Sequence, residues 1–427
     1  MAVSPAAKVA VCGLWHLGST AVAGLLSHGR SIVAYDPQST LRDGARAGIA
    51  PTGEPGVGPA LLDGFRDGRL TVVDTLAEWA RCEVGLLAYD SAVDEAGGVD
   101  DERLPEAVAA FAEHAPPNAV LVVMSQVLAR THEQWRKTLL ARRADLRLVH
   151  VPENLRLGKA IEDFVAPPRL VVGADDREAA ELAAGLFPHA SPEYVGLTEA
   201  ELVKHATNAY LGMCVSFANE VGWIAARNEA DPRVVMRLVK ADPRVSDRAP
   251  LLPGAAFSGA TLRRDLVALS RLGADCGRPE FFDMVSELND RHAGFALTLL
   301  AAELGELGER QIAVAGLTYK PSTATLRDSL PLQLVRALLK DGAQVSVYDP
   351  IAEPLPADLA VRRCSTLADA VRDADALLVA SALPELRRTD WAGLEPASKL
   401  VVDGCGALDP AEFAGTGWRC VGMHAGT

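Results

Sequence analysis

The sequence predicts an α/β protein in which two Rossmann-like domains with parallel sheets are joined by a helical middle domain. Short apolar strands alternate with helical segments near both ends of the chain, the pattern of parallel sheets covered by helices. Between them runs a long stretch whose apolar residues are spaced by three and four. Because 427 residues are too many for one core, we expect separate domains over residues 1–197, 198–300 and 301–427.

In the first domain the strand–helix alternation begins close to the N-terminus. Strands are predicted over residues 8–11, 31–35, 83–88, 119–124 and 147–151, and helices near 105–113 and 132–140. The Pro/Gly-rich stretch 51–59 is predicted to be a surface loop.

The middle domain is predicted to open with a long helix from Thr198 to about Glu229, where Thr198 and Glu201 fit a capping box. A second strand–helix pattern starts at Gln311 and includes a helix through Leu339. Its further strands are predicted over residues 345–349, 376–380 and 400–402. The two ends of the chain therefore resemble each other.

The composition narrows the class of partner. A net charge of −14 argues against nucleic acid or an anionic membrane as a partner, although a local basic pocket still suits an anionic small molecule. No apolar stretch has the length of a membrane span. The seven cysteines contain no CxxC pair and predict neither a disulfide framework nor a metal site. We therefore expect a cytoplasmic protein.

The turn after the first strand lies where a dinucleotide fingerprint belongs. Its candidate cofactor-binding residues are Gly13, Trp15, His16, Leu17 and Gly18. Asp36, at the end of the second strand, is placed to accept a hydrogen bond from a ribose hydroxyl, while amides at the helix N-terminus would hold a pyrophosphate. Trp15 replaces the middle glycine. The alternative is therefore a tight turn that binds no ligand, or a turn in which Trp15 points outward or changes how the cofactor lies. We expect NAD.

The segment Leu252–Leu269 carries the most informative motif. Its register places Pro253, Gly254, Phe257, Gly259, Thr261 and Asp265 on the pattern Pro-Gly-x-Gly-Tyr/Phe-Gly-Gly-x-Cys-x-x-Lys-Asp. The segment thereby resembles the UDP-glucose and GDP-mannose dehydrogenases, whose cysteine forms a thiohemiacetal and then a thioester with the sugar aldehyde. Thr261 stands at the cysteine position, and its hydroxyl stays protonated unless a base activates it. The structural alternative makes Thr261 the N-cap of a helix over 262–272, with Asp265 at the positive end of its dipole.

The resemblance extends to the sugar site. Residues 151–158 are similar to the family's Pro-Glu-Phe-Leu-Arg-Glu-Gly motif, which implies that Glu153, Asn154, Leu155 and Arg156 contact substrate. Leu157 stands in place of a glutamate that, with a threonine, positions the hydrolytic water. The Ser-Thr pair that supplies this threonine reads Ser125-Gln126, and Ser125 is implied at the cofactor.

Two basic motifs complete the resemblance. Lys204 and Asn208 match a family helix whose lysine and asparagine stabilise the developing oxyanion, so we expect both to be catalytic, together with Glu153, Thr261 and Asp265. The implied substrate residues also include Arg244, Phe257, Gly259, Lys320 and Arg327. Lys320 and Arg327 lie in a loop typical of nucleotide-sugar binding, and Arg244 is implied to reach a neighbouring subunit.

The resemblance implies an NAD-dependent oxidoreductase acting on a nucleotide sugar, with a UDP-sugar favoured, in a homodimer formed through the long middle helix. The replaced cysteine, threonine and glutamate predict an enzyme that stops at the carbonyl, oxidises a secondary alcohol or epimerises without net redox change. The alternative is a catalytically inactive binding or regulatory protein that keeps the nucleotide-sugar pocket, for which Trp15 is the supporting feature.

Overall fold

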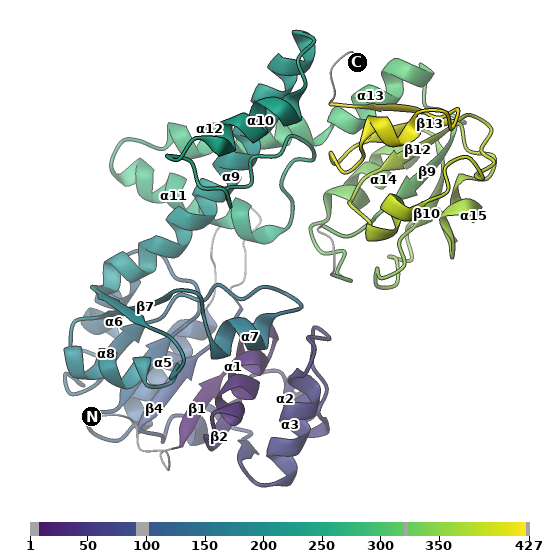
Figure 1. Ribbon diagram of the computed structural model, residues 1–427. Helices are drawn as coiled ribbons and strands as arrows, with labels where there is room; N and C mark the ends of the chain where they lie inside the picture. The colour runs from purple at the N-terminus through teal and green to yellow at the C-terminus, as the bar shows by residue number, and fades with distance from the viewer. Residues whose placement is uncertain (1–7, 91–101, 320–322, 424–427) are drawn as a thin grey trace. The chain divides into compact units, whose positions relative to one another are not determined.

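The computed structural model describes residues 8–90, 102–319 and 323–423, and the chain divides into two compact units, Met1–Thr207 and Asn208–Thr427. Each unit contains one β-sheet flanked by helices, and further helices lie between the two sheets in the sequence (Figure 1). The predicted fold class is therefore confirmed.

An eight-stranded sheet of order β3-β2-β1-β4-β5-β6-β7-β8 forms the core of the N-terminal unit. Its strands are β1 (Val9–Cys12), β2 (Ile32–Tyr35), β3 (Leu70–Val72), β4 (Val84–Leu87), β5 (Val120–Val123), β6 (Arg147–His150), β7 (Leu170–Ala174) and β8 (Pro192–Val195). Paired strands are parallel, and Val9 pairs with Ile32 on one side and Val84 on the other. β6 and β7 are the antiparallel exception, which the sequence pattern did not reveal.

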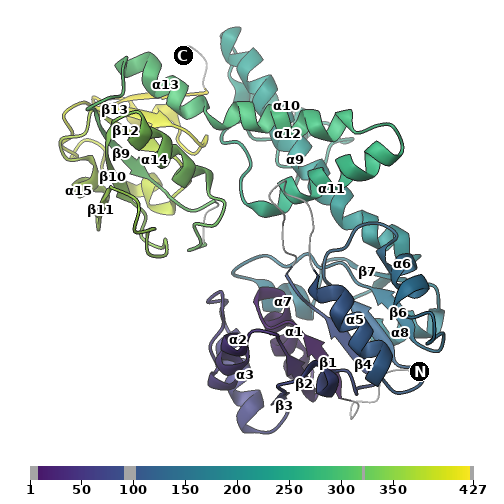
Figure 2. The same ribbon diagram turned by 180° about the vertical axis from the view of Figure 1, so that it is seen from behind.

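Helices cover both faces of this sheet. They are α1 (His16–Ser27), α2 (Ser39–Ala47), α3 (Val57–Arg66), α4 (Leu76–Trp79), α5 (Arg103–His114), α6 (Thr131–Thr138), α7 (Ala160–Val165) and α8 (Arg177–Ala184). Successive β1 residues point to opposite faces: Val9 and Val11 join the core under α1, whereas Ala10 and Cys12 join the core under α5, which lies in front of the sheet in Figure 2. Burial on both faces explains why the strands are continuous apolar runs.

The loop predicted over 51–59 is wrong at its end, because α3 already begins at Val57. Gly56, the residue before it, adopts the left-handed conformation and starts the helix without a side-chain cap. Val57 and Leu61 are then buried in the core beside α1. Burial of these apolar side chains therefore outweighs the turn-forming tendency of the Pro/Gly-rich sequence.

The long predicted helix is α9 (Leu197–Arg227). The predicted capping box is wrong, because the helix starts at Leu197 and the carboxylate of Glu201 is used elsewhere. One oxygen of Glu201 accepts from the Arg130 amide at 2.6 Å, and the other accepts from the His132 amide at 2.9 Å. Glu201 therefore anchors α9 to the start of α6 and does not cap its own helix.

The C-terminal unit contains the remaining middle helices and the second sheet. These helices are α10 (Pro232–Ala241), α11 (Ala260–Asp275), α12 (Glu280–Ala293) and α13 (Phe295–Leu304). The alternative in which Thr261 is the N-cap of α11 is wrong. The N-cap is Gly259, whose φ of 80° suits glycine, and the helix already includes Ala260.

The second sheet has the order β11-β10-β9-β12-β13-β14, and each pair of neighbouring strands is parallel. Its elements are β9 (Gln311–Ala315), α14 (Leu330–Lys340), β10 (Gln344–Tyr348), β11 (Arg362–Cys364), α15 (Leu367–Val371), β12 (Ala376–Val379), the 3-10 turns η1 (Pro384–Arg388) and η2 (Pro410–Phe413), β13 (Leu400–Asp403) and β14 (Arg419–Gly422). In both sheets the strand order reverses beside the first strand. The crevice at such a reversal is where α/β proteins bind ligands.

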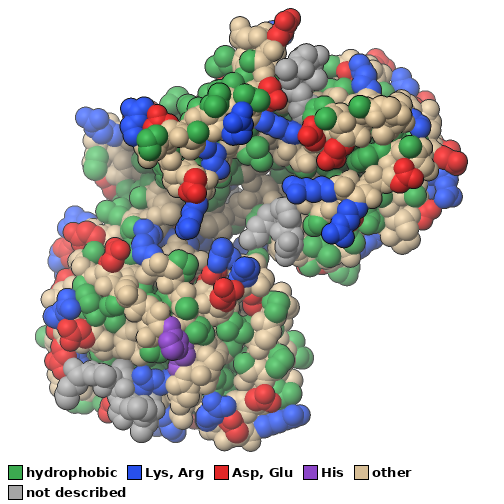
Figure 3. All heavy atoms as spheres, viewed as in Figure 1, with side chains coloured by type: hydrophobic (Ala, Val, Ile, Leu, Met, Phe, Trp, Pro, Cys, Tyr) green, Lys and Arg blue, Asp and Glu red, His purple; other side chains and the backbone are tan. Residues whose placement is uncertain are grey.

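The surface fits the composition. Lys and Arg side chains are intermixed with Asp and Glu on the visible face of each unit (Figure 3). Among the residues that the structure describes, no helix is both long and apolar enough to cross a membrane. All seven cysteines are free thiols.

Candidate functional site

The turn between β1 and α1 requires glycine at two positions. Gly13 has a φ of 106°, and a Cβ on it would lie 2.6 Å from the carbonyl oxygen of Ala88. A Cβ on Gly18 would lie 1.8 Å from the carbonyl oxygen of Gly13. The turn is therefore packed against the end of β4, at the reversal point of the N-terminal sheet.

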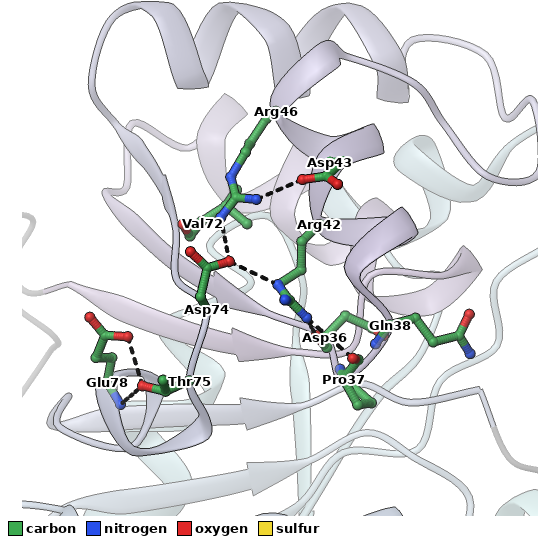
Figure 4. A network of polar contacts seen from close by, with 10 residues as sticks. All are labelled: Asp36, Pro37, Gln38, Arg42, Asp43, Arg46, Val72, Asp74, Thr75 and Glu78. Carbon is green, nitrogen blue, oxygen red and sulfur yellow. Dashed lines mark hydrogen bonds and ion pairs between the residues drawn. The ribbon is translucent and has the colours of Figure 1, made fainter.

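Asp36 anchors this turn from the end of β2. Its buried carboxylate accepts the amide of Leu14 at 2.8 Å and the amide of Gln38 at 2.9 Å. Burial raises the pKa of Asp36 above its usual value. Arg42 donates to the carbonyl oxygen of Asp36 at 2.7 Å and to Asp74 at 3.1 Å, as Figure 4 shows. A carboxylate at the end of this strand suits NAD better than NADP, whose 2′-phosphate it would repel.

The side chains of Trp15 and His16 lie beside this turn. Trp15 is the N-cap of α1, forms no side-chain cap, and is 38% exposed. The side chain of His16 approaches Thr52, with 3.2 Å between Nδ1 and Oγ1. Trp15 thus fits the outward-turned alternative.

Asp90 also reaches this turn. It lies shortly after β4, beyond Ala88 and Tyr89, and its Oδ2 accepts the amide of Leu17 at 3.0 Å. Burial raises the pKa of Asp90 to about 7. Asp90 was not among the predicted site residues, although an acidic side chain just after a buried strand is a recognisable signal in the sequence.

Ser125 and Gln126 lie after β5 on the same sheet. The Ser125 hydroxyl is buried and has no hydrogen-bond partner in the described part of the chain. The amide nitrogen of Gln126 lies 3.1 Å from ring nitrogens of His205, whose Nε2 is 2.9 Å from the carbonyl oxygen of Val127. Gln126 is therefore held by protein groups.

Four predicted substrate residues line one pocket of about 280 Å³ in the N-terminal unit: Glu153, Asn154, Leu155 and Arg156. One oxygen of Glu153 accepts the Leu155 amide at 2.7 Å, and the other lies 3.4 Å from the buried ammonium of Lys204. Arg156 makes a two-point ion pair with Asp163, at 2.6 Å and 2.9 Å, which lowers the pKa of Asp163. The charges of Glu153 and Arg156 are thus already paired.

Asn208 and Asp265 form a buried hydrogen-bonded pair in the C-terminal unit. The Asn208 amide nitrogen donates to Asp265 at 2.5 Å, and Arg264 approaches the same carboxylate at 3.2 Å and 3.3 Å. Asp265 is fully buried, whereas Thr261, one turn earlier on α11, is exposed. The helix therefore presents Thr261 to the surface while its aspartate stays inside.

The loop that precedes α11 is held from several sides. The amide of Phe257 donates to Asn289 at 2.8 Å, and the amide of Gly259 donates to the carbonyl oxygen of Asp328 at 2.9 Å. A Cβ on Gly259 would lie 2.9 Å from the Tyr319 ring. Phe257 and Gly259 are thereby brought to the loop after β9 that also carries Arg327.

The remaining basic candidates differ in their surroundings. Arg327 is exposed, with its Nε 3.6 Å from Asp328. Arg244 is exposed and pairs with Asp242 at 2.7 Å. Lys320 lies outside the described residues. In the described ranges, no group of three or more His, Cys, Asp or Glu is arranged to hold a metal ion.

Comparison with known proteins decides the family. The NAD binding domain of the UDP-glucose/GDP-mannose dehydrogenase family matches residues 7–191, its central domain matches 198–291, and its UDP binding domain matches 313–410. The chain belongs to this family.

Individual family members match over almost their whole length. A UDP-glucose dehydrogenase structure from Pyrobaculum islandicum is 29% identical with a TM-score of 0.86, covering 98% of each chain. The UDP-glucose 6-dehydrogenase TuaD of Bacillus subtilis is 27% identical over 98% of this chain and 94% of its own. A UDP-glucose 6-dehydrogenase of Pseudomonas aeruginosa is 29% identical over 97% of both.

The N-terminal unit thus carries the NAD-binding domain of the dehydrogenase family, and its residues fit that cofactor in three respects. The turn at Gly13 and Gly18 is tight enough for backbone amides to face a phosphate, Asp36 marks the end of β2, and the Ser125 hydroxyl is a buried group without a partner. Asp90 is the exception, because its carboxylate holds a backbone amide in the same turn.

Proposed function

We propose that this family member is an NAD-dependent oxidoreductase that acts on a CH–OH group of a nucleotide sugar, with a UDP-sugar favoured, and that it forms no cysteine thioester. The observation that carries the proposal is Thr261. It stands on the first turn of α11, at the place of the cysteine in the motif, one turn before the buried pair of Asp265 with Asn208. A neutral threonine hydroxyl is a poor substitute for a thiolate as acyl carrier.

The proposed roles follow from the contacts. NAD, held by the β1–α1 turn, would supply the hydride acceptor. The Lys204 ammonium, oriented by Glu153, stabilises the negative charge that develops on the substrate oxygen, and Asn208 is held for the same task by Asp265. Gln126 is tied to His205 and is not available to position a hydrolytic water. The reaction then ends at a carbonyl or returns the hydride in a redox-neutral epimerisation.

The assignment of binding tasks is part of this proposal. Residues 1–197 bind NAD, residues 198–300 form the dimer, and residues 301–427 bind the nucleotide sugar. The turn residues from Gly13 to Gly18, with Asp36 and Ser125, serve the cofactor. The residues proposed to serve the sugar nucleotide are Glu153, Asn154, Leu155, Arg156, Lys204, Asn208, Arg244, Phe257, Gly259, Lys320 and Arg327. We place the protein in the cytoplasm, where seven free thiols stay reduced.

A homodimer is proposed because α9 carries an exposed apolar stripe. Tyr210, Phe217 and Ile224 recur every seven residues and are 47%, 49% and 63% exposed. Hydrophobic side chains also gather over α10 and α12 in Figure 3, where Leu238 and Met284 are exposed. Large exposed apolar side chains on one helical face are typical of a protein–protein contact.

The test is a product and electron count. Purified protein is incubated with NAD and a panel of UDP-sugars, NADH is measured by absorbance, and products are identified by mass spectrometry. The proposal expects at most one NADH per sugar, and a uronate formed with two NADH would contradict it. Lys204→Met should abolish turnover, whereas Lys137→Met, at an exposed lysine of α6, should leave it unchanged.

The second candidate is a nucleotide-sugar-binding or regulatory protein without turnover. It is favoured by the cofactor turn, where Trp15 replaces a glycine and Asp90 occupies an amide. UDP-sugar affinity without measurable NAD affinity, both determined by calorimetry, would favour this candidate over the enzyme.

A further inference from the structure

Two carboxylates of the chain already bind the backbone amides of the cofactor turn. Asp36 takes the Leu14 amide at 2.8 Å, and Asp90 takes the Leu17 amide at 3.0 Å. Leu17 lies in the first turn of α1, where unpaired amides and the helix dipole favour an anion. These are the groups that hold a pyrophosphate when a dinucleotide binds to such a turn.

The C-terminal unit repeats this turn without the second carboxylate. There the Leu317 amide donates to Asp349 at 2.8 Å, as the Leu14 amide donates to Asp36. The register is also repeated, because the Ala88 amide bonds to the carbonyl oxygen of Cys12 and the Ala380 amide to that of Ala315. Two residues further on, this equivalence pairs Asp90 with Ala382. The turn therefore forms without an acidic residue at this position.

The surroundings of Asp90 neutralise its charge only in part. Arg103 on α5 donates to the backbone carbonyl oxygen of Asp90 at 2.9 Å, and its guanidinium lies 4.6 Å from the centre of the Tyr89 ring. The like charge of Glu153, after β6, helps to raise the pKa of Asp90. Of the charged groups that the structure describes around Asp90, Glu153 thus opposes the ionised carboxylate while Arg103 favours it.

We propose that Asp90 is a built-in competitor of the cofactor pyrophosphate, and that its carboxylate must leave the Leu17 amide before NAD can bind fully. This inference rests on the proposed function only through the NAD site. Like charges placed side by side are strongly unfavourable. Asp90 therefore sets the NAD affinity of this chain and keeps it lower than the glycine turn alone would allow.

The two ways in which Asp90 competes can be separated by substitution. Asp90→Asn keeps an oxygen that can accept the Leu17 amide but removes the charge, whereas Asp90→Ala removes both. We expect the dissociation constant for NAD to fall about tenfold or more in Asp90→Asn, and further in Asp90→Ala. Asp63→Asn, an exposed position on α3, removes the same charge from the same unit and should leave NAD affinity unchanged.

The experiment is calorimetric titration of the full chain with NAD, and separately with UDP, at fixed salt and at about pH 8.5. This pH lies above the pKa of about 7 that burial gives Asp90, so its carboxylate is ionised. The UDP titration, which addresses the C-terminal unit, reports that each variant is folded, and the melting temperature without ligand reports the loss of the Leu17 contact. If Asp90 had only a structural role, its substitution would lower the melting temperature and leave NAD affinity unchanged or weaker. That result would overturn the proposal.

The possible failures are distinguishable. If the original chain and both variants bind NAD equally well, the competitor role is wrong and the oxidoreductase proposal stands. If none of them binds NAD while all bind UDP, both proposals fail. Should Asp90→Asn not fold, Asp90→Ser gives the same reading with a short polar side chain.

Discussion

The buried pair of Asn208 and Asp265 gives the sharpest prediction about stability. Asp265 is fully buried and accepts both the Asn208 amide and the Arg264 guanidinium. Asn208→Ala leaves Asp265 with Arg264 and should cost about 1–3 kcal/mol of unfolding free energy. Asp265→Ala leaves the largely buried Arg264 cation and the Asn208 amide without this acceptor, and should cost about 3–5 kcal/mol.

The double variant tests whether the two side chains act together. Once Asp265 is gone, removing Asn208 should cost little more, so the double variant should be more stable than the sum of the single effects by about 1–3 kcal/mol. Hydrogen exchange over peptides of α9 and α11, combined with urea unfolding, measures these differences. Ser270 lies on α11, the helix of Asp265, and Ser270→Ala removes an exposed bond to Asp283 of α12; its cost should stay within about 0.5 kcal/mol. Additive single effects, with a coupling below about 0.5 kcal/mol, would refute the reasoning.

Three further predictions concern charge, assembly and chemistry. Burial raises the pKa of Asp90 from 3.8 to about 7, so the folded chain retains this proton from about pH 4 to 7 while the unfolded chain loses it. The free energy of unfolding should therefore fall with rising pH in that window, by at most about 4 kcal/mol. Equal pH dependence of the melting temperature for Asp90→Asn and the original chain would contradict this. Tyr210→Asp with Ile224→Asp should convert the proposed dimer to a monomer in mass photometry, whereas Ile49→Asp, at an exposed position of the N-terminal unit, should not. Thr261→Cys should gain a thiol that iodoacetamide labels, yet release no uronate, because the groups that position the hydrolytic water are still missing; uronate detected by mass spectrometry would count against this.

The fold could be predicted because its strongest signals are local. The strands β1, β4 and β5 are short buried apolar runs, and α9 shows helical spacing over its whole length. The antiparallel pairing of β7 with β6 was not predicted, because the direction of a strand is set by the segment it pairs with and not by its own sequence.

The candidate site was predictable where motifs are contiguous and less so where contacts join distant residues. Glu153 to Arg156 are adjacent in sequence and line one pocket. Asn289 on α12 and His292 on the same helix hold the loop before α11, at 2.8 Å and 2.7 Å, but lie 30 or more residues from it. No sequence spacing connects such residues, so only the folded chain identifies them.

Thr261 shows that a prediction from residue type can also be wrong because of a neighbouring residue. Its N-cap role was a sound expectation from residue type, since threonine favours that position. The positive φ that glycine allows at Gly259 places the start of α11 earlier, and Thr261 lies inside the helix. Backbone freedom at one glycine therefore decided the environment of a residue two positions later.

The duplicated bond at the two glycine turns changes how an acidic residue after a second strand should be interpreted. Asp36 and Asp349 make the same contact, although one unit matches an NAD binding domain and the other a UDP binding domain. Such an aspartate acts first as an internal clasp for the loop and only second as a partner for a ribose. Substituting either aspartate to change nucleotide preference will therefore disturb local architecture before it alters selectivity.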